Sequence, residues 1–292
     1  MGKRPGAKYA ALQRLNALMA DHQKRSEAKD EARARGESLF AFSDGKIHAF
    51  ESRNNYQKIV MRFIDWCREQ YNVRDLAHID EQADELASLY LLERIEKGYS
   101  AWTLQTERSA LRLFFQDRTL TDSVELPKRR REEIKRSRRP AKRDQHINLE
   151  NYQHVINFCL ACGLRREELR DLYVREVYHR PSDGQLVVFV RHGKGGKSRE
   201  VPVFPGREEA VLSQVTGRDP HAHVFARLST LLDIHSYRRQ FAQELYEHLS
   251  GQPLPPQEGR LQSAELDHDA ALEVSRCLGH NRIDIIFGHY IR

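Results

Sequence analysis

Residues 149–172, which read LENYQHVINFCLACGLRREELRDL, decide how the second half of this chain folds. Apolar side chains recur there every three or four positions, which predicts an amphipathic helix with one buried face. Gly163 can end that helix because glycine readily adopts the left-handed conformation of a C-cap. A second helix should begin at once and hold Arg165 on the same face as Glu168. The expected buried face of the first helix comprises Leu149, Tyr152, Val155, Ile156, Cys159 and Leu160.

Two short runs downstream have the composition of β-strands. Residues 186–191 read LVVFVR and residues 198–204 read SREVPVF, and the glycine-rich stretch HGKGGK joins them. This arrangement predicts a β-hairpin. Lys194 or Lys197 would project from its tip, either as a mobile cation available to a ligand or as a solvated turn residue.

The stretch 231–239, LLDIHSYRR, places His235 and Arg238 on one face of a helix expected from about residue 233 to 247. A guanidinium beside an imidazole suits a bound phosphate, although the same pattern also describes a solvated helix face. Residues 250–270 are rich in Pro, Gly and Gln, so they predict a long loop. A further helix should follow this loop.

The first half of the chain predicts a compact helical domain. Residues 1–45 are rich in Ala, Arg, Lys and Glu and indicate a polar helix in a mobile or auxiliary arm. Apolar residues then recur with helical spacing over 52–67, over 84–97, where Gly98 can end the helix, and from about residue 103. Three basic side chains lie off the apolar stripe of the first of these helices: Arg53, Lys58 and Arg62.

Charge is concentrated in one segment of the chain. The 292 residues include 48 Lys and Arg against 42 Asp and Glu, a net charge of +6. Residues 128–143 hold ten basic and two acidic side chains, a net charge of +8, which leaves −2 for all other residues. Pro127 interrupts the helical pattern just before them, so we interpret the segment as a linker. It could be a solvated linker or a strap on a phosphate backbone, and both can hold, because a flexible basic linker becomes ordered when it neutralises phosphates.

The cysteines indicate neither a disulfide framework nor a metal site. Cys67, Cys159, Cys162 and Cys277 lie in apolar helical patterns, which favours core thiols in a reducing cytoplasm over a disulfide framework. The Cys159-x-x-Cys162 pair lacks a second ligand pair at zinc-like spacing, so we expect no metal. No run of residues resembles a signal peptide or a membrane span, and we expect no membrane partner.

Groups from these separate stretches could surround one phosphodiester. Arg165 and Arg238 would hold its non-bridging oxygens and stabilise the added charge of a pentacoordinate transition state. Tyr290 would be the nucleophile, and the hairpin lysine would protonate the departing sugar oxygen. His235 and His280 would assist proton transfer or donate hydrogen bonds to the phosphate.

The order of these motifs resembles the tyrosine recombinase (phage integrase) family. GLRREEL at 163–169 matches the G-L-R-x-x-E-L box of that family, and Lys194 in GKGGKSREVPV fits its hairpin lysine. HSYR at 235–238 fits H-x-x-R, LGH at 278–280 fits L-G-H, and Tyr290 fits the nucleophile. The wording LGHNRID and the 250–270 insertion are most similar to integrases of mobile elements.

The resemblance covers roughly residues 50–292 and is strong after residue 146. It implies a mainly α fold with a small antiparallel β-sheet, in the two-domain architecture of tyrosine recombinases, whose domains grip DNA like a C-shaped clamp. The expected parts are an N-terminal helical and basic arm (1–45), a helical core-binding domain (46–126), a basic linker (127–145) and an α+β catalytic domain (146–292).

The resemblance also implies an activity and its partners. Double-stranded DNA recombination sites would be cleaved and rejoined through a 3′-phosphotyrosine, without a cofactor, by a tetramer of protomers on paired sites. Accessory DNA-bending or directionality factors would assist. The implied catalytic residues are Arg165, Lys194, His235, Arg238, His280 and Tyr290, supported by Glu168. The implied DNA contacts are Arg53, Lys58, Arg62, Lys128, Arg129, Arg130, Arg131, Lys135, Arg136, Arg138, Arg139, Lys142 and Arg143.

Three spacings depart from the family pattern. Arg238 and His280 are 42 positions apart, roughly twenty more than the family suggests, which the Pro-rich loop can absorb. Tyr290 follows His280 by ten positions instead of the usual nine, a shift that a turn at Gly288 could absorb. Because only two residues follow Tyr290, we expect the C-terminal segment that many relatives dock onto a neighbour to be absent or very short.

Two other functions fit the same residues less completely. A topoisomerase-like nicking and closing enzyme, or a resolvase, would use the same chemistry and differ in the number of DNA sites it needs. A non-catalytic DNA-binding protein could keep the fold, but it would have no use for Tyr290. The leading hypothesis is a mobile-element integrase in a bacterial cytoplasm, associated with the nucleoid.

Overall fold

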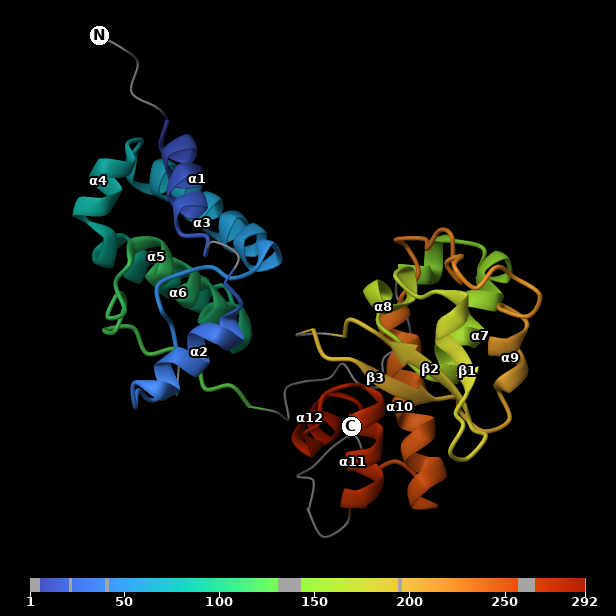
Figure 1. The fold of residues 1–292 in the computed structure, drawn as a ribbon. Coiled ribbons are helices and arrows are strands. Elements are labelled where there is room, and N and C mark those ends of the chain that lie inside the picture. Colours follow the sequence, from blue (N-terminus) through green and yellow to red (C-terminus); the bar gives the residue numbers. More distant parts are fainter. Residues whose placement is uncertain are drawn as a thin grey trace. The chain divides into compact units, whose positions relative to one another are not determined.

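The computed structural model describes residues 6–20, 23–39, 42–130, 143–193, 196–256 and 266–291. The chain forms two compact units, Met1–Arg129 and Arg130–Arg292 (Figure 1). Each unit has its own hydrophobic core. Over these residues the fold is mainly helical with a small antiparallel sheet, as the sequence predicted. None of the described helices is long and apolar enough to cross a membrane.

The first unit is built from helices that pack their apolar faces together. The three helices expected from the sequence are present, and α4 is an addition because its six residues are too few to show a period. Side-chain caps fix two of the starts: Asp75 accepts from Ala77 N–H at 2.9 Å, and Ser100 accepts from Thr103 N–H at 3.3 Å. The helices are α1 (Ala7–Ala17), α2 (Arg25–Ala34), α3 (Phe50–Tyr71), α4 (Leu76–Glu81), α5 (Ala83–Glu96) and α6 (Ala101–Phe115).

The N-terminal helix is packed, not free. Ala7, Ala11 and Leu15 of α1 are buried in the first core, and α1 lies along α3. Two of these three side chains are methyl groups, which let the helices approach closely but give little signal in a sequence rich in charge. The expected arm therefore contributes at least one helix to the core.

A buried ion cluster joins the helices of the first unit. Glu107 is 1% exposed and accepts from Arg94 Nη2 at 2.5 Å and from Arg62 Nη1 at 3.0 Å. Arg94 is itself buried, and its guanidinium lies 3.3 Å from the centre of the Tyr99 ring. Arg62, which the sequence placed at a DNA surface, therefore also helps to neutralise a buried carboxylate inside the unit.

The second unit surrounds a three-stranded antiparallel sheet in the order β1-β2-β3. The two predicted strands pair as a hairpin, with Val188 opposite Val201, and the three-residue strand β1 was not expected. Helices α7 and α10 pack on each other, and α11 packs on both α10 and α12. The elements are α7 (Gln153–Cys162), α8 (Arg166–Arg170), β1 (Val177–His179), β2 (Leu186–Val190), β3 (Arg199–Pro202), α9 (Glu208–Leu212), α10 (Ile234–Ser250), α11 (His268–Cys277) and α12 (Ile283–His289), with single 3₁₀ turns at Arg143–His146, Leu149–Tyr152 and Val174–Glu176.

Gly163 ends α7 as predicted, in the left-handed conformation with φ +58°. The Phe241 ring of α10 lies against it, so closely that a Cβ at this position would come within 2.2 Å of a ring carbon. The glycine therefore does two things: it turns the chain and it allows α7 to meet α10. One prediction for α7 was wrong, because Leu149 lies in a 3₁₀ turn ahead of the helix and is 39% exposed.

A comparison of Ala variants at Gly163 and at Gly251, the C-cap of α10, separates the cost of backbone strain from the cost of a steric clash. Gly251 has nearly the same φ, +63°, but a Cβ there would have no atom within 4 Å. Gly251→Ala should cost only the backbone strain, about 1–2 kcal/mol in free energy of unfolding. Gly163→Ala should cost clearly more because Phe241 must also move. Urea denaturation of both variants measures the difference, and equal losses would show that the clash is relieved without cost.

Candidate active site

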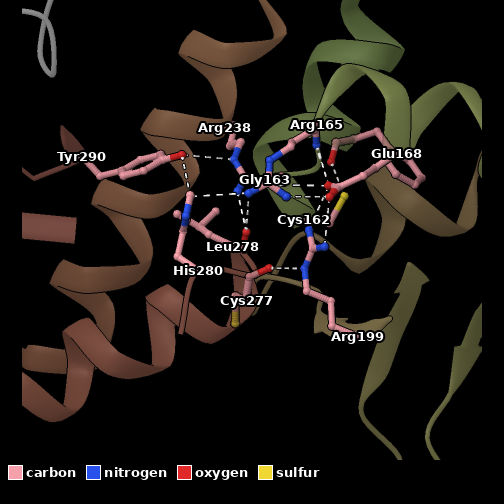
Figure 2. A network of polar contacts seen from close by, with 11 residues as sticks. Cys162, Gly163, Arg165, Glu168, Arg199, Arg238, Cys277, Leu278, His280 and Tyr290 are labelled. Atoms are coloured by element: carbon pink, nitrogen blue, oxygen red, sulfur yellow. Dashed lines mark hydrogen bonds and ion pairs between the residues drawn. The ribbon is translucent and has the colours of Figure 1, made fainter. Parts of the chain in front are cut away.

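Four of the six predicted catalytic residues meet in the second unit (Figure 2). Arg165 immediately precedes α8, Arg238 lies on α10, His280 follows α11 and Tyr290 ends α12. The Tyr290 hydroxyl lies 3.3 Å from Arg238 Nε and 3.3 Å from His280 Nε2. Arg165 Nη2 lies 3.4 Å from the same His280 nitrogen. Residues separated by more than a hundred positions are thus brought into one contact group.

Arg238 forms the buried base of this group. It is 1% exposed, and it donates from Nη1 to Gly163 O and from Nη2 to Leu278 O, both at 2.6 Å. Burial lowers the pKa of its guanidinium, yet an arginine remains charged at any ordinary pH. These two carbonyls fix the orientation of the guanidinium. The predicted helical face that pairs it with His235 is confirmed in α10.

Tyr290 reaches the group from within its own chain. Its side chain is 5% exposed, and Ile286 and Ile291 beside it are fully buried. Gln243 of α10 donates to the Tyr290 carbonyl at 2.7 Å, which ties the end of α12 to the helix that carries Arg238. The predicted turn at Gly288 was wrong, because α12 continues through it to residue 289. Tyr290 is the C-cap of this regular helix.

Glu168 holds Arg165 in place. Its carboxylate accepts from the Arg165 backbone N–H at 2.8 Å, as a residue at the third position of a helix often does, and from Arg165 Nη1 at 2.7 Å. Arg165 Nη2 donates to Leu278 O at 3.0 Å. Burial would raise the pKa of Glu168, but hydrogen bonds and charge from Arg199, with help from Arg165 and Arg238, outweigh it and lower the pKa to about 2. The carboxylate is therefore ionised.

Arg199 was not identified from the sequence. It is the first residue of β3, and it forks onto Glu168 with Nη1 to Oε1 at 2.9 Å and Nη2 to Oε2 at 2.8 Å. Its Nε donates to Cys277 O at 2.8 Å, at the end of α11. The position looked like an ordinary polar residue of a hairpin strand. The signal that could have revealed it is an arginine two positions after the glycine-rich connection that carries the candidate lysines.

His235 lies beside this group of contacting residues, on its exposed side. Its side chain is exposed, and its ring centre lies 6.1 Å from that of Tyr290. Desolvation by the surrounding chain, then the charges of Arg238 and Arg239, lower its pKa below the usual 6.5, which favours a neutral imidazole at pH 7. His235, Arg165 and Arg238 line a cavity of about 220 Å³. That cavity is where an anion could meet all three.

Asp144 fixes the start of α10 from outside the helix. Its buried carboxylate accepts hydrogen bonds from the backbone N–H of Asp233 and from the hydroxyl of Tyr237. Burial and the Asp144 charge raise the pKa of Tyr237, so its hydroxyl stays protonated as a donor. The carboxylate also faces the positive end of the helix dipole. This anchor orients the turn of α10 that presents His235.

The remaining predicted contacts are placed only in part. Lys194 lies outside the described residues, and Lys197 is exposed, with its carbonyl accepting from Gly193 N–H at 2.9 Å. Lys58 is exposed, whereas Arg53 donates to Asn16 Oδ1 at 2.7 Å. In the linker, the described and exposed side chains are Lys128, Arg129 and Arg130; Arg131, Lys135, Arg136, Arg138, Arg139 and Lys142 lie outside the described residues, as does the side chain of Arg143.

The cysteine pair of α7 has the character of core thiols. Cys159 and Cys162 are fully buried, and burial raises the pKa of both thiols, that of Cys159 to about 12. Within the described part of the chain, no cluster of three or more His, Cys, Asp or Glu side chains is placed to hold a metal ion.

The lowered pKa of Glu168 makes a prediction about stability. The folded state favours the ionised carboxylate, so its stabilisation should be complete above pH about 4.5 and be lost as the pH falls towards 2. Glu168→Gln should lower the free energy of unfolding at pH 7 by about 3–5 kcal/mol, because buried guanidiniums lose their counter-charge. It should also flatten the acid limb of a stability profile measured by urea denaturation.

Glu200→Gln is the matched control for this test. Glu200 follows Arg199 directly on β3 but its carboxylate is one-third exposed, so its loss should change stability by less than about 1 kcal/mol. An acid limb that keeps its full slope in Glu168→Gln would contradict the assignment of the low pKa to Glu168.

No curated protein matches the sequence. Among solved structures, the Tn1549 transposon integrase (residues 82–397) in complex with circular intermediate DNA is 16% identical, with 96% of this chain and 94% of that chain covered and a TM-score of 0.47. The XerH site-specific recombinase bound to palindromic difH substrate is 15% identical, with 97% and 91% covered and a TM-score of 0.49.

The family comparison concerns the first unit. Residues 46–119 match the family model described as the phage integrase N-terminal SAM-like domain. These residues include α3 to α6, the helices whose periodicity the sequence showed. Residues 46–119 of the first unit are therefore similar to the N-terminal SAM-like domain of phage integrases, in agreement with the resemblance to the tyrosine recombinase family that the sequence predicted.

Proposed function

We propose that this protein is a site-specific DNA recombinase that cleaves and rejoins DNA through a 3′-phosphotyrosine, for integration or excision of a mobile element. One observation carries the proposal: the Tyr290 hydroxyl lies 3.3 Å from both Arg238 Nε and His280 Nε2, with Arg165 beside them. A phenol among two guanidiniums and an imidazole is suited to attack a phosphodiester. A binding module would not need a hydroxyl there.

The reaction proposed for this geometry is a transesterification. Tyr290 Oη forms a bond to phosphorus while the bond from phosphorus to the sugar O5′ breaks. The phenol proton passes to a base, and His280 Nε2 is the imidazole nitrogen within reach. The departing O5′ takes a proton from an acid, for which Lys194 is the candidate from the family pattern. Rejoining reverses these steps, so the phosphodiester is conserved and no co-reactant is needed.

The two arginines would act on the non-bridging oxygens. A guanidinium has five N–H groups, and the contacts of Arg238 account for three of them: one each from Nε, Nη1 and Nη2. Arg165 donates one N–H to the Glu168 carboxylate and one to Leu278 O. Both side chains line the cavity that His235 also lines, so their remaining N–H groups can reach a phosphate placed there.

The partners belong to the same proposal. DNA contact would involve the exposed residues at the start of the linker, Lys128 to Arg130, together with Lys58 of α3. Recombination exchanges strands between two duplexes, so we propose a tetramer of protomers on paired sites. The domain bounds 1–45, 46–126, 127–145 and 146–292, and the help of DNA-bending or directionality factors, are proposed on the family resemblance.

The nucleophile is tested by trapping. The probe is a set of duplexes that the protein selects by binding from a random pool, nicked at successive positions so that the cleaved end diffuses away. With EDTA present, the wild-type protein should form a covalent adduct that is seen as a shifted band in a denaturing gel. Tyr290→Phe should bind the same DNA and form none, while Tyr178→Phe, a control on β1, should still form it.

A mixing experiment locates the tyrosine in the assembly. Because Tyr290 Oη contacts Arg238 and His280 of its own chain, a mixture of Tyr290→Phe with Arg165→Ala should form no adduct. Adduct restored by mixing would show that the tyrosine is donated between protomers. A metal-dependent cut that leaves no protein on the DNA would overturn the proposed mechanism.

The linker is tested by the salt dependence of DNA binding. Replacing Lys128, Arg129 and Arg130 with Gln should weaken binding to all sequences and reduce the slope of log affinity against log salt by about 0.9 for each lost phosphate contact. Three exposed arginines of the second unit serve as the matched control, which should leave the slope unchanged: Arg170, Arg175 and Arg227. An unchanged slope in the linker variant would show that these side chains are only solvated.

A further inference from the structure

We propose that Arg199 is a positioning residue for DNA cleavage: it fixes Arg165 through Glu168 and joins the β2–β3 hairpin to the turn that carries His280. The inference rests on the proposed function. The Arg199 side chain contacts other groups of the protein, so its effect on the phosphate would be exerted through Arg165.

Arg199 and Arg165 share the Glu168 carboxylate completely. Oε1 accepts from Arg165 Nη1 at 2.7 Å and from Arg199 Nη1 at 2.9 Å. Oε2 accepts from the Arg165 backbone N–H and from Arg199 Nη2, both at 2.8 Å. With its oxygens shared in this way and only 2% of its side chain exposed, the carboxylate has one orientation available. That orientation decides where the Arg165 guanidinium points.

The charge of Arg199 matters as much as its geometry. If Glu168 were balanced by Arg165 alone, the carboxylate would cancel most of the positive charge that Arg165 can offer to a phosphate. Arg199 supplies the neutralising charge from the opposite side, which leaves Arg165 with a net field directed at the cavity. Removing Arg199 should therefore weaken the stabilisation of the transition state more than it weakens DNA binding, which depends on many other cations.

Two glycines make room for this side chain, one on each of the segments it joins. A Cβ at Gly193 would lie 2.9 Å from Arg199 Nη1 and 2.7 Å from Lys197 O. A Cβ at Gly279, in the turn before His280, would lie 3.2 Å from Arg199 Nη1, and this residue also has φ +68°. Arg199 Nε also donates to Cys277 O, which links the guanidinium to the end of α11. The hairpin and the turn thus both contact the Arg199 guanidinium. We therefore assign Arg199 a role in positioning the site for catalysis and not only in folding.

The test compares Arg199→Met with Arg199→Lys on three forms of the selected nicked duplex. The first has an ordinary phosphodiester, the second a methylphosphonate that lacks one non-bridging charge, and the third a 5′-bridging sulfur that leaves without protonation. On the ordinary duplex, Arg199→Met should form adduct about 100-fold more slowly than wild type, as expected when a catalytic group is misplaced by about 1 Å. DNA affinity should be nearly unchanged.

The modified duplexes separate positioning from loss of structure. If Arg199 acts through Arg165, the methylphosphonate should recover most of the rate in Arg199→Met and in Arg165→Ala, because the charge that Arg165 neutralises is gone. The bridging sulfur should not recover it, because the leaving group is not at fault. Arg199→Lys, which keeps the charge but cannot span both carboxylate oxygens, should lie between wild type and Arg199→Met.

A control and a second variant make the result decisive. Arg191→Met breaks the ion pair of Arg191 with buried Glu176, a comparable pair away from the site, and should leave the rate unchanged on all three duplexes. If Arg199→Met is too unstable, the double variant with Glu168→Gln removes both charges and should show the same recovery on the methylphosphonate.

Each possible outcome has one meaning. Equal deficits of Arg199→Met on all three duplexes would reduce Arg199 to a structural role, and a normal rate on the ordinary duplex would remove it from the site; either result overturns this inference alone. If the wild-type protein forms no adduct on any nicked duplex, the proposed function fails, and the positioning role fails with it.

Discussion

The structure of the site depends on one buried anion, the carboxylate of Glu168. Three guanidiniums lie around it: those of Arg165 and Arg199 in direct hydrogen bonds, and that of Arg238 with Nη1 at 3.9 Å from Oε2. Cations of like charge repel strongly where little water screens them, so such a group needs an internal counter-charge to be buried at all. The low pKa of Glu168, about 2, is the consequence of that demand.

Backbone carbonyls complete what the carboxylate begins. Leu278 O accepts from Arg165 Nη2 at 3.0 Å and from Arg238 Nη2 at 2.6 Å, so one peptide group holds both arginines that are proposed to bind the phosphate. Gly163 O accepts from Arg238 on the other side, at the end of α7. Gly163 at the end of α7 and Gly279 after α11 are therefore part of the site's geometry. They turn the chain so that its carbonyls point at guanidiniums.

The sequence predicted most of this arrangement because its signals are local. Helical periods revealed α3, α5, α6, α7 and α10, and the left-handed cap at Gly163 followed from its position. Short elements such as α4, β1 and α9 have too few residues to show a period, and the exposure of Leu149 depends on a 3₁₀ turn that periodicity does not distinguish from a helix. Arg199 escaped notice because its partners, Glu168 and Cys277, are far away in the sequence. Long-range pairing of a charge is visible only when the fold is known.

The charge of the buried group fits the reaction that we propose. Among the described residues, the three guanidiniums around Glu168 and its single carboxylate leave two net positive charges beside the Tyr290 hydroxyl. A phosphodiester brings one negative charge, so the bound substrate leaves the group with an excess of one positive charge. In the proposed reaction, Tyr290 Oη gives its proton to His280 and bonds to phosphorus, and the two negative charges of the pentacoordinate species then balance the two net positive charges of the guanidiniums and Glu168. Enzymes gain rate from interactions that are stronger in the transition state than before it. A carboxylate, two glycine-capped turns and a shared carbonyl hold these cations in place, so in the proposed reaction their charge would act on the transition state without prior rearrangement of the site.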